Sequence, residues 1–441
     1  MQFEHSNSHQ SSSRSRELDA TYRKITWRLL PYLFVAYVFA YLDRVNIGFA
    51  ATHFKADLNF SDAIYGLGAG IFFIGYLLCE IPSNLLMNKI GARLTIARIM
   101  ICWGFVSCCM MLIKSPTSFY LLRLLLGIFE AGFAPGVLLY LTLWFPPQRR
   151  AHMAAIFLSG AAVAGLIGAP VSGWILDTMD QVGGIRGWQW LFLLEGVPSI
   201  LLGLLALVLL PNRPNDAKWL SHQPNQRVNA DLLTPDSSSS HGFLDALRDP
   251  VIYYISIAWF TVICGIYAVS FWMPMLMQEA GLKTSTEVGL WSIIPYGFTA
   301  LGMIVISRHS DKSMERRWHA ATCALLGAVG LGMLPFVQGN FALTMAALTL
   351  TSTAVFTAMP IILSMPMCYL SRKAAPGGIA FVNTIGLLGG VASPYVLGLI
   401  KTSTGSLNNG LFLISGLLVI GALLLIGAVR LEPRTRSAIA S

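Results

Sequence analysis

Long apolar segments recur along the whole chain and set its organisation. Twelve of them are long enough to cross a bilayer as α-helices, since about 20 apolar residues span the hydrocarbon core. They cover residues 27–51, 63–87, 94–113, 118–145, 153–177, 188–210, 251–278, 287–307, 318–337, 341–369, 377–400 and 409–430. The pattern predicts an all-α membrane protein with twelve transmembrane helices.

Polar stretches divide these segments into two sets of six. Residues 211–250 form the longest connection, which carries prolines, asparagines and a serine run at 237–240. Such a composition is typical of a solvated linker. We therefore predict a disordered tail at 1–26, a first bundle at 27–210, a linker at 211–250, a second bundle at 251–430 and a tail at 431–441.

An internal repeat supports two halves of the same topology. The loop motif that starts at Asn88 recurs at Asp311, an offset of 223, and Pro170 of the fifth segment corresponds to Pro394 of the eleventh, an offset of 224. Parallel repeats of this kind are typical of transporters that bind substrate at the midplane between their halves. The sequence therefore predicts two parallel six-helix halves.

Composition and charge placement support a membrane protein rather than a nucleic-acid-binding one. The chain is 55% hydrophobic and 12% charged, about half the charged fraction of soluble domains. Loops on the side of the N-terminus hold 23 lysines and arginines, whereas the opposite loops hold five. The positive-inside rule then places both termini and the linker in the cytoplasm. The net charge of +9 thus reflects topology.

Four charged residues lie deep inside two predicted helices. Arg123 and Glu130 of the fourth segment are seven residues apart, so they share a face about 10 Å apart along the axis. Asp43 and Arg44 lie in the first segment at a similar predicted depth. A charge at bilayer depth costs at least ~2.5 kcal/mol, so it normally faces a polar cavity or a partner. We expect these four side chains to meet in one polar pocket.

The sum of these four charges suggests coupling between an anion and a proton. They cancel when all are ionised, so a bound carboxylate would leave an unbalanced negative charge that a proton on Asp43 or Glu130 could remove. Arginine remains charged and can bind a carboxylate through two hydrogen bonds. The competing interpretation is that the four charges form static ion pairs that only fix helix packing.

Uncharged side chains complete the predicted site. Tyr37 and Tyr41 share a face of the first segment with Arg44. The other candidates for contact with a substrate are Tyr76, Tyr267, Trp272 and Asn383. A helix–helix hydrogen bond is an equally good explanation for Asn383. Glu80 is expected to stabilise the nearby basic loop, and Glu195 to be structural.

Several of these motifs resemble the major facilitator superfamily, and within it the anion:cation symporters. The resemblance is carried by Leu42–Ala50 with its Asp43-Arg44-Val-Asn46 core, by Pro82–Leu86, Arg123–Gly136, Gly187–Gly196 and Phe381–Asn383. It covers all twelve segments and is greatest for bacterial permeases of tartrate, 4-hydroxyphenylacetate, phthalate and galactonate. It implies proton-driven import of a carboxylate by alternating access.

The resemblance also implies roles for individual residues. The arginine that matches Arg44 contacts the substrate carboxylate, the acids that match Asp43 and Glu130 take protons, and the arginine that matches Arg123 organises those acids. Tyr76 and Asn383 match positions that contact substrate.

The superfamily's gating motif after the second helix of each half corresponds to Asn88, Lys89 and Arg93, and to Asp311, Lys312 and Arg316. Asn88 replaces the usual aspartate. Ala161 and Ala162 stand where sugar-acid relatives carry an amide, which favours an aromatic or less hydroxylated acid.

The leading hypothesis is a proton-coupled symporter for an organic carboxylate in a bacterial inner membrane, acting as a monomer. An exchanger or uniporter that uses the same site without net proton movement is the alternative. No histidine or cysteine spacing suits a metal, and no nucleophile motif favours an enzyme. No cofactor is expected apart from the coupling proton.

Overall fold

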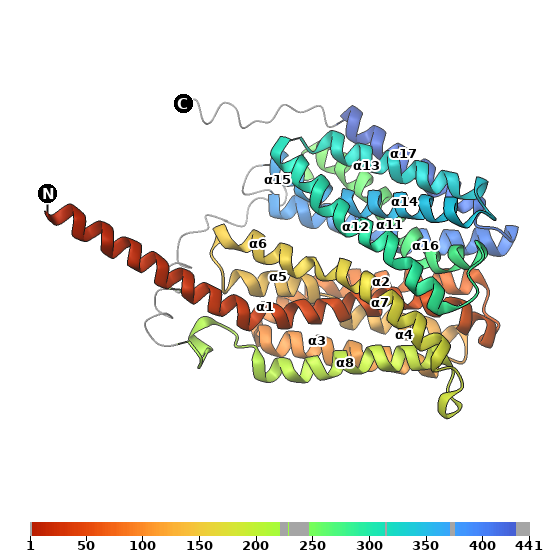
Figure 1. Ribbon diagram of the computed structural model, residues 1–441, viewed down its shortest axis with the longest axis horizontal. Helices are drawn as coiled ribbons and strands as arrows, with labels where there is room; N and C mark the ends of the chain where they lie inside the picture. The colour runs from red at the N-terminus through yellow and green to blue at the C-terminus, as the bar shows by residue number, and fades with distance from the viewer. Residues whose placement is uncertain (1, 221–227, 229–246, 314, 371–374, 429–441) are drawn as a thin grey trace.

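The structure is a computed structural model that describes residues 2–220, 228, 247–313, 315–370 and 375–428. All regular secondary structure within these residues is helical. Twelve of the described helical stretches are long and apolar enough to cross a membrane. The predicted fold class is therefore confirmed, and Figure 1 shows the helices running side by side along the long axis of the molecule.

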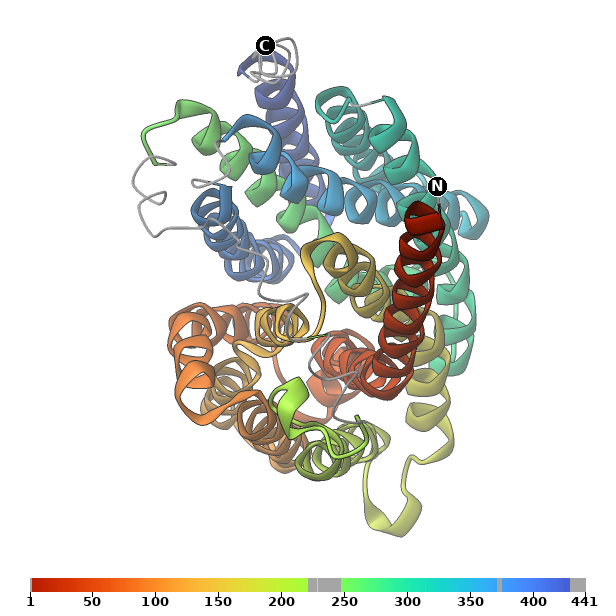
Figure 2. The ribbon, with the colours of Figure 1, turned by 90° about the vertical axis from the view of Figure 1, so that its left-hand side faces the viewer.

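The first half comprises α1 (Gln2–Leu58), α2 (Asp62–Ile90), α3 (Ala92–Cys109), α4 (Pro116–Glu130), α5 (Phe133–Thr142), α6 (Pro147–Leu158), α7 (Gly160–Thr178) and α8 (Gly187–Leu209). The second half comprises α11 (Pro250–Glu279), α12 (Ser285–Ser313), α13 (Arg317–Met333), α14 (Phe341–Ser364), α15 (Pro366–Tyr369), α16 (Ala375–Thr404) and α17 (Asn408–Ala428). Figure 2, viewed along the helices, shows the two halves as neighbouring bundles.

Glycines allow the two halves to pack closely at one end of the bundle. We call this the distal end: it holds the α1–α2, α7–α8, α11–α12 and α16–α17 connections and lies away from the N-terminus (Figure 1). There α2 packs along α16, and α7 along α12. A Cβ added to Gly66 of α2 would lie 2.2 Å from the Pro394 carbonyl oxygen, and one added to Gly289 of α12 would lie 2.4 Å from that of Ala169. Only glycine permits this approach.

These two crossings are related by the sequence repeat. Gly66 and Gly289 differ by 223 positions, the offset predicted from the gating motifs. Further along, a Cβ on Gly398 would lie 2.3 Å from the Asp62 carbonyl oxygen, and one on Gly173 would lie 2.2 Å from that of Ser285. Equivalent residues of the two halves therefore make equivalent contacts, as parallel repeats require.

A reciprocal pair of helix caps joins the halves next to these glycines. The Asp177 carboxylate, at the end of α7, accepts hydrogen bonds from the backbone N–H groups of Ser285 (3.1 Å) and Thr286 (2.7 Å) at the start of α12. The Thr402 hydroxyl, near the end of α16, accepts one from the N–H of Ala63 (2.8 Å) at the start of α2. Each half thus caps a helix of the other, using N–H groups that a helix N-terminus leaves free.

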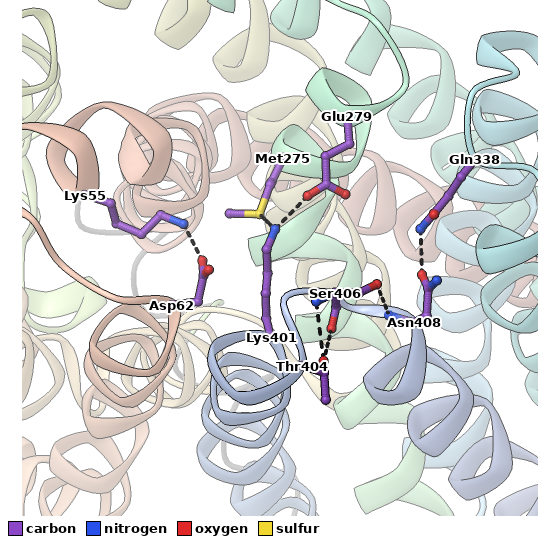
Figure 3. Close-up of polar contacts among 9 residues, drawn as sticks. All are labelled: Lys55, Asp62, Met275, Glu279, Gln338, Lys401, Thr404, Ser406 and Asn408. Atoms are coloured by element: carbon purple, nitrogen blue, oxygen red, sulfur yellow. Dashed lines mark hydrogen bonds and ion pairs between the residues drawn. The ribbon is translucent and has the colours of Figure 1, made fainter.

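Ion pairs within each half surround this closed distal end (Figure 3). Lys55 pairs with Asp62 in the first half. In the second half the Lys401 ammonium lies 2.6 Å from a Glu279 carboxylate oxygen and 6.0 Å from the centre of the Trp272 ring. These pairs link neighbouring helices of one half and therefore add no contact between halves.

The N-terminal region differs from the prediction. Residues 1–26 were expected to be disordered, but α1 begins at Gln2. Leu18, Tyr22, Ile25 and Leu29 recur every three or four residues, and the last three are fully buried. The Tyr22 ring stacks on Phe145 with a centroid distance of 6.0 Å. The apolar stripe of the first helix therefore extends further back than its hydropathy indicated.

The predicted linker also begins later than expected. The indole of Trp219 stacks on that of Trp144 at 6.0 Å, and its carbonyl accepts a hydrogen bond from Lys24 Nζ (2.8 Å). Residues 211–220 therefore pack against the first half, and residues 221–227 and 229–246 lie outside the described residues.

The fourth predicted span is broken at the charged site. Helix α4 ends at Glu130, and α5 starts at Phe133 after Gly132, whose φ is +86°. An L-residue is strained at that φ, and a Cβ there would also lie 2.8 Å from Ser83 Cβ. The break leaves Glu130 at a helix end, where its side chain is turned toward α1 and pairs with Arg44.

Candidate functional site

Arg44 lies at the centre of a cluster built from α1, α2 and α4. Its guanidinium pairs with the carboxylate of Glu130 and lies 5.3 Å from the centre of the Tyr76 ring. The Arg44 side chain is 16% exposed, whereas that of Glu130 is 1% exposed. Arg44 is therefore the accessible member of this ion pair.

Arg123 is fully buried beside this pair. Its Nε donates a hydrogen bond to the carbonyl of Gly68 (3.2 Å). The Phe72 ring centre lies 5.0 Å from the Arg123 guanidinium and 5.4 Å from that of Arg44, so one aromatic ring contacts both cations. Such contacts are worth about 2 kcal/mol each when desolvated. Sequence analysis did not select Phe72, although it lies one helical turn before Tyr76 on the same face of α2.

Three buried polar atoms of this cluster have no hydrogen-bond partner among the described residues. They are Arg44 Nε, Arg123 Nη2 and Glu130 Oε2. Buried polar atoms normally have a hydrogen-bond partner, so each atom without one requires an explanation. Two guanidinium N–H groups that lack an acceptor are suited to binding an anion.

The predicted meeting of four charges is wrong for Asp43. Its carboxylate accepts hydrogen bonds from Trp103 Nε1 (2.6 Å), Ser107 Oγ (2.8 Å) and Ser199 Oγ (3.2 Å), so it faces α3 and α8. Consecutive residues of a helix point about 100° apart. Arg44 can therefore face α2 and α4 only if Asp43 faces elsewhere. Arg44, Arg123 and Glu130 form the contiguous cluster, and Asp43 lies behind it.

A second carboxylate lies beside Asp43. Glu195 of α8 is 3% exposed and accepts hydrogen bonds from Ser172 Oγ (2.7 Å) and from Asn46 Nδ2 (2.9 Å). The same Asn46 nitrogen lies 3.5 Å from Asp43 Oδ1. Glu195 therefore belongs to a polar network within the first half. Sequence analysis did not predict this network, because no regular spacing connects residues 43, 46, 172 and 195.

Residues 33–367 match the Major Facilitator Superfamily. The chain belongs to the Major Facilitator Superfamily. It is 42% identical over 399 residues to NicT of Pseudomonas putida, named for metabolite transport, with 90% of this chain and 91% of that protein covered. It is 43% identical over 397 residues to an Agrobacterium vitis protein named as a tartrate transporter, with 89% and 91% covered.

A solved structure has the same fold. A bacterial homologue of the human lysosomal transporter Spinster, crystallised in an inward-facing and occupied conformation, aligns with a TM-score of 0.74 at 16% identity over 93% of this chain and 97% of that one. The family and the relatives establish that this facilitator is a membrane transporter and not an enzyme.

Tyrosines from both halves of the transporter surround Arg44. The phenols of Tyr37, Tyr76 and Tyr267 interact electrostatically with its guanidinium. The Tyr37 ring lies 6.4 Å from that of Tyr41. Tyr267 belongs to α11, so the second half contributes directly to the neighbourhood of the charged cluster. Together with Arg123 and Glu130, seven aromatic or charged candidates from the sequence are thus brought together.

The other two candidates from the second half lie elsewhere. Trp272 is fully buried against Tyr65, with ring centroids 5.3 Å apart, and close to Lys401. It is one and a half helical turns from Tyr267 toward the distal end, where it supports the closed contact. Asn383 is half-buried on α16, and no hydrogen bond of its side chain is found among the described residues.

Glu80 lies on α2 one helical turn after Tyr76, whose ring lies 5.3 Å from the Arg44 guanidinium. Its carboxylate interacts electrostatically with Arg44 and with Tyr76, one turn before it on α2. We expected it to support the basic loop.

The hydrogen bonds and ion pairs found for the gating motifs among the described residues join residues of the same half. The backbone N–H of Arg93 donates to Asn212 Oδ1 (3.0 Å). Arg316 pairs with Asp311 (3.3 Å) and donates to the carbonyl of Ser364 (3.0 Å). Asn88, Lys89 and Lys312 are exposed.

Proposed function

We propose that this transporter imports an organic anion with at least one carboxylate, together with protons, across a bacterial inner membrane by alternating access. The observation that carries the proposal is the buried Arg44–Glu130 ion pair, flanked by the unpartnered N–H groups of Arg44 and Arg123. A guanidinium that already holds a carboxylate, with free N–H groups beside it, is chemically suited to exchange one carboxylate for another.

Exchange of carboxylates at Arg44 supports proton coupling even though Asp43 does not share a pocket with the other three charged residues. A substrate carboxylate that binds Arg44 competes with Glu130 for the same guanidinium. Glu130 is buried, and an ionised carboxylate that loses its partner in a buried site is strongly disfavoured. A proton on Glu130 removes that penalty. Substrate binding and proton uptake are then linked through Arg44.

The excess of basic loops on the side of the termini supports a cytoplasmic location for that side. The distal end then faces outward, and the glycine crossings and reciprocal caps close the outer side in the state described above. Import requires these contacts to separate so that substrate can reach Arg44 from outside.

Tartrate is the first substrate to test, because one relative is named for it. It offers two carboxylates for Arg44 and Arg123, and two hydroxyl groups for the surrounding phenols. An exchanger or uniporter using the same site is the alternative. Adding tartrate to de-energised vesicles distinguishes them: a symporter makes the external medium more alkaline, whereas the alternatives leave its pH unchanged.

Replacing the two members of the ion pair tests the proposal directly. Truncation of one partner of a buried, hydrogen-bonded charge pair costs about 2–5 kcal/mol. We therefore expect Arg44→Ala to weaken tartrate binding by at least about 30-fold. Glu130→Gln should retain tartrate binding and counterflow but lose accumulation driven by a pH gradient. Glu279→Gln, which removes an exposed acid, is the control. Normal accumulation by Glu130→Gln would refute the role of Glu130.

A further inference from the structure

The network around Glu195 contains two buried carboxylates but no basic side chain. Asp43 and Glu195 are 1% and 3% exposed. The side chains that contact them are Asn46 from α1, Trp103 and Ser107 from α3, Ser172 from α7 and Ser199 from α8, all of them neutral. Neither carboxylate forms an ion pair with any described residue.

Charged and titratable groups nearby do not change this conclusion. Each carboxylate interacts electrostatically with the other, and Glu130 and Arg123 of α4 act on Asp43 without contacting it. The Cys108 thiol of α3 is a further titratable neighbour of Asp43. Two ionised carboxylates here would place two negative charges in a region that excludes water. The effective cost of burying an unpaired ion is several kcal/mol.

The hydrogen bonds distinguish the two acids. Asp43 is contacted on both oxygens by three hydrogen-bonding groups, and the one at the shortest distance, the Trp103 indole N–H at 2.6 Å, can only donate, which favours an ionised carboxylate. Glu195 has two neighbours, and the shorter contact is a hydroxyl, Ser172 Oγ, which can accept a hydrogen bond as well as donate one. A carboxylic acid at Glu195 can donate a hydrogen bond to Ser172 Oγ, while its other oxygen still accepts one from Asn46 Nδ2.

We propose that Glu195 is a second proton-binding residue of this transporter, linked to Asp43 through Asn46 and separate from the Arg44–Glu130 pair. The inference rests on the proposed proton coupling and extends it to a site within the first half. With Glu195 protonated, the two arginines balance Asp43 and Glu130, so the five buried groups are neutral together.

The proposed proton site at Glu195 lies apart from Arg44, where the substrate is proposed to bind. Glu195 lies eight residues after the start of α8, which is about 12 Å from the distal end. Ser172 lies six residues before the end of α7, so it is also toward the distal end. A proton can thus be held between α1, α7 and α8, away from Arg44. Exchange of this proton during the cycle would make the number of protons moved per substrate greater than Glu130 alone can provide.

Infrared spectroscopy of the purified, full-length protein tests protonation without a substrate. A protonated carboxyl group absorbs at a carbonyl frequency distinct from that of a carboxylate. We expect the wild-type protein at neutral pH to show such a band, and Glu195→Gln to lose one carboxyl equivalent of it. The control Glu279→Gln should retain the full band. An unchanged band in Glu195→Gln would overturn the proposal.

Transport measurements test whether this proton is exchanged. In proteoliposomes we expect Glu195→Gln to keep tartrate counterflow but to move fewer protons per tartrate than the wild type. Glu195→Asp, which retains an acid, should recover part of the stoichiometry. Wild-type stoichiometry in Glu195→Gln would mean that the proton is fixed, and this would also overturn the proposal. Ser172→Ala provides a second test if Glu195→Gln does not fold: it should shift the carboxyl band, and an unshifted band would count against the assignment.

The proposed function can fail independently. If the wild-type protein moves no protons with tartrate, the symport proposal fails for that substrate, whereas the infrared band still decides whether Glu195 holds a proton.

Discussion

One aromatic side chain at the charged site contacts both arginines. Phe72 contacts the guanidinium groups of both Arg44 and Arg123, which have the same charge and lie near a single acid, Glu130. The negative face of an aromatic ring attracts cations and, unlike a carboxylate, adds no formal charge. Phe72 thus helps to keep two arginines close together while leaving them free to bind an anion.

Substitution of Phe72 tests this function. We expect Phe72→Leu to lose two cation–π contacts, to lower the thermal unfolding temperature of the detergent-purified protein and to reduce tartrate affinity about tenfold or more. Phe72→Tyr preserves the ring and should stay close to the wild type. Phe105→Leu, at a position that is 62% exposed, controls for the change in side-chain volume. Equal effects of Phe72→Leu and Phe72→Tyr would show that ring contact with the arginines is unimportant.

At the same scale, the sequence predicts some neighbours and not others. Arg123 and Glu130 could be placed on one face because helical spacing determines it, and their proximity to Arg44 followed from the cost of a buried charge. The direction of Asp43 could not be predicted. Adjacent side chains of a helix point about 100° apart, so Asp43 and Arg44 cannot both face α2 and α4. Asp43 faces away because Trp103, Ser107 and Ser199, which come from distant segments, bind its carboxylate. The polar network of Glu195 could not be predicted for the same reason, because its partners Ser172 and Asn46 come from other helices.

At the scale of helices, two caps join the halves at the distal end. Asp177 and Thr402 occupy equivalent places in the two halves, and they cap residues 286 and 63, which are 223 positions apart. The two caps differ in chemistry, because one uses a carboxylate and the other a hydroxyl. A carboxylate also interacts favourably with the positive end of the helix dipole. The α7–α12 cap should therefore be the stronger of the two.

We expect removal of these caps to favour the state in which the distal end is open. Loss of an N-cap costs about 0.5–2 kcal/mol, which corresponds to a roughly 2- to 30-fold shift of the equilibrium. Asp177→Ala should shift it more than Thr402→Ala. Distances between spin labels on α7 and α12, measured by electron paramagnetic resonance, would report the shift of the equilibrium toward the open distal end.

Matched controls lie next to both caps. Asp180 accepts a hydrogen bond from Gly187 within the first half (2.8 Å), and the Ser403 hydroxyl bonds within its own helix. Asp180→Ala and Ser403→Ala should therefore leave the label distances unchanged. A shift of equal size in Asp180→Ala and Asp177→Ala would argue against a specific cap between halves.

For the molecule as a whole, hydropathy predicted the twelve spans well because bilayer thickness fixes their length. It did not predict the extension of α1 to Gln2 or the break after Glu130. Around Tyr22 the first is supported by packing against Phe145, and the second arises from the left-handed backbone at Gly132. The sequence shows a glycine at position 132, but only its φ of +86° shows that the chain turns there. The departures from the expected helices thus arise from tertiary contacts and backbone conformation.

Gly66 and Gly289 occupy equivalent positions in the two halves, and their close packing leads to a prediction about the whole transport cycle. Closure of the distal end brings Gly66 of α2 onto α16 and Gly289 of α12 onto α7, with no room for a Cβ. Gly66→Val or Gly289→Val should therefore prevent closure in either half of the interface and hold the distal end open. Tartrate binding should survive, whereas uptake should fall to background, because alternating access needs both states.

Spin-label distances across α2 and α16, together with tartrate uptake, would measure this effect. Gly416→Val is a suitable control, since a Cβ there would meet no atom within 4 Å. It should preserve both uptake and distances. If Gly66→Val and Gly289→Val kept wild-type uptake with an unchanged distance distribution, the glycine crossings would not be the contacts that close this end. Because the two sites are equivalent by the repeat, a defect in one and none in the other would show that closure depends on one half of the interface alone.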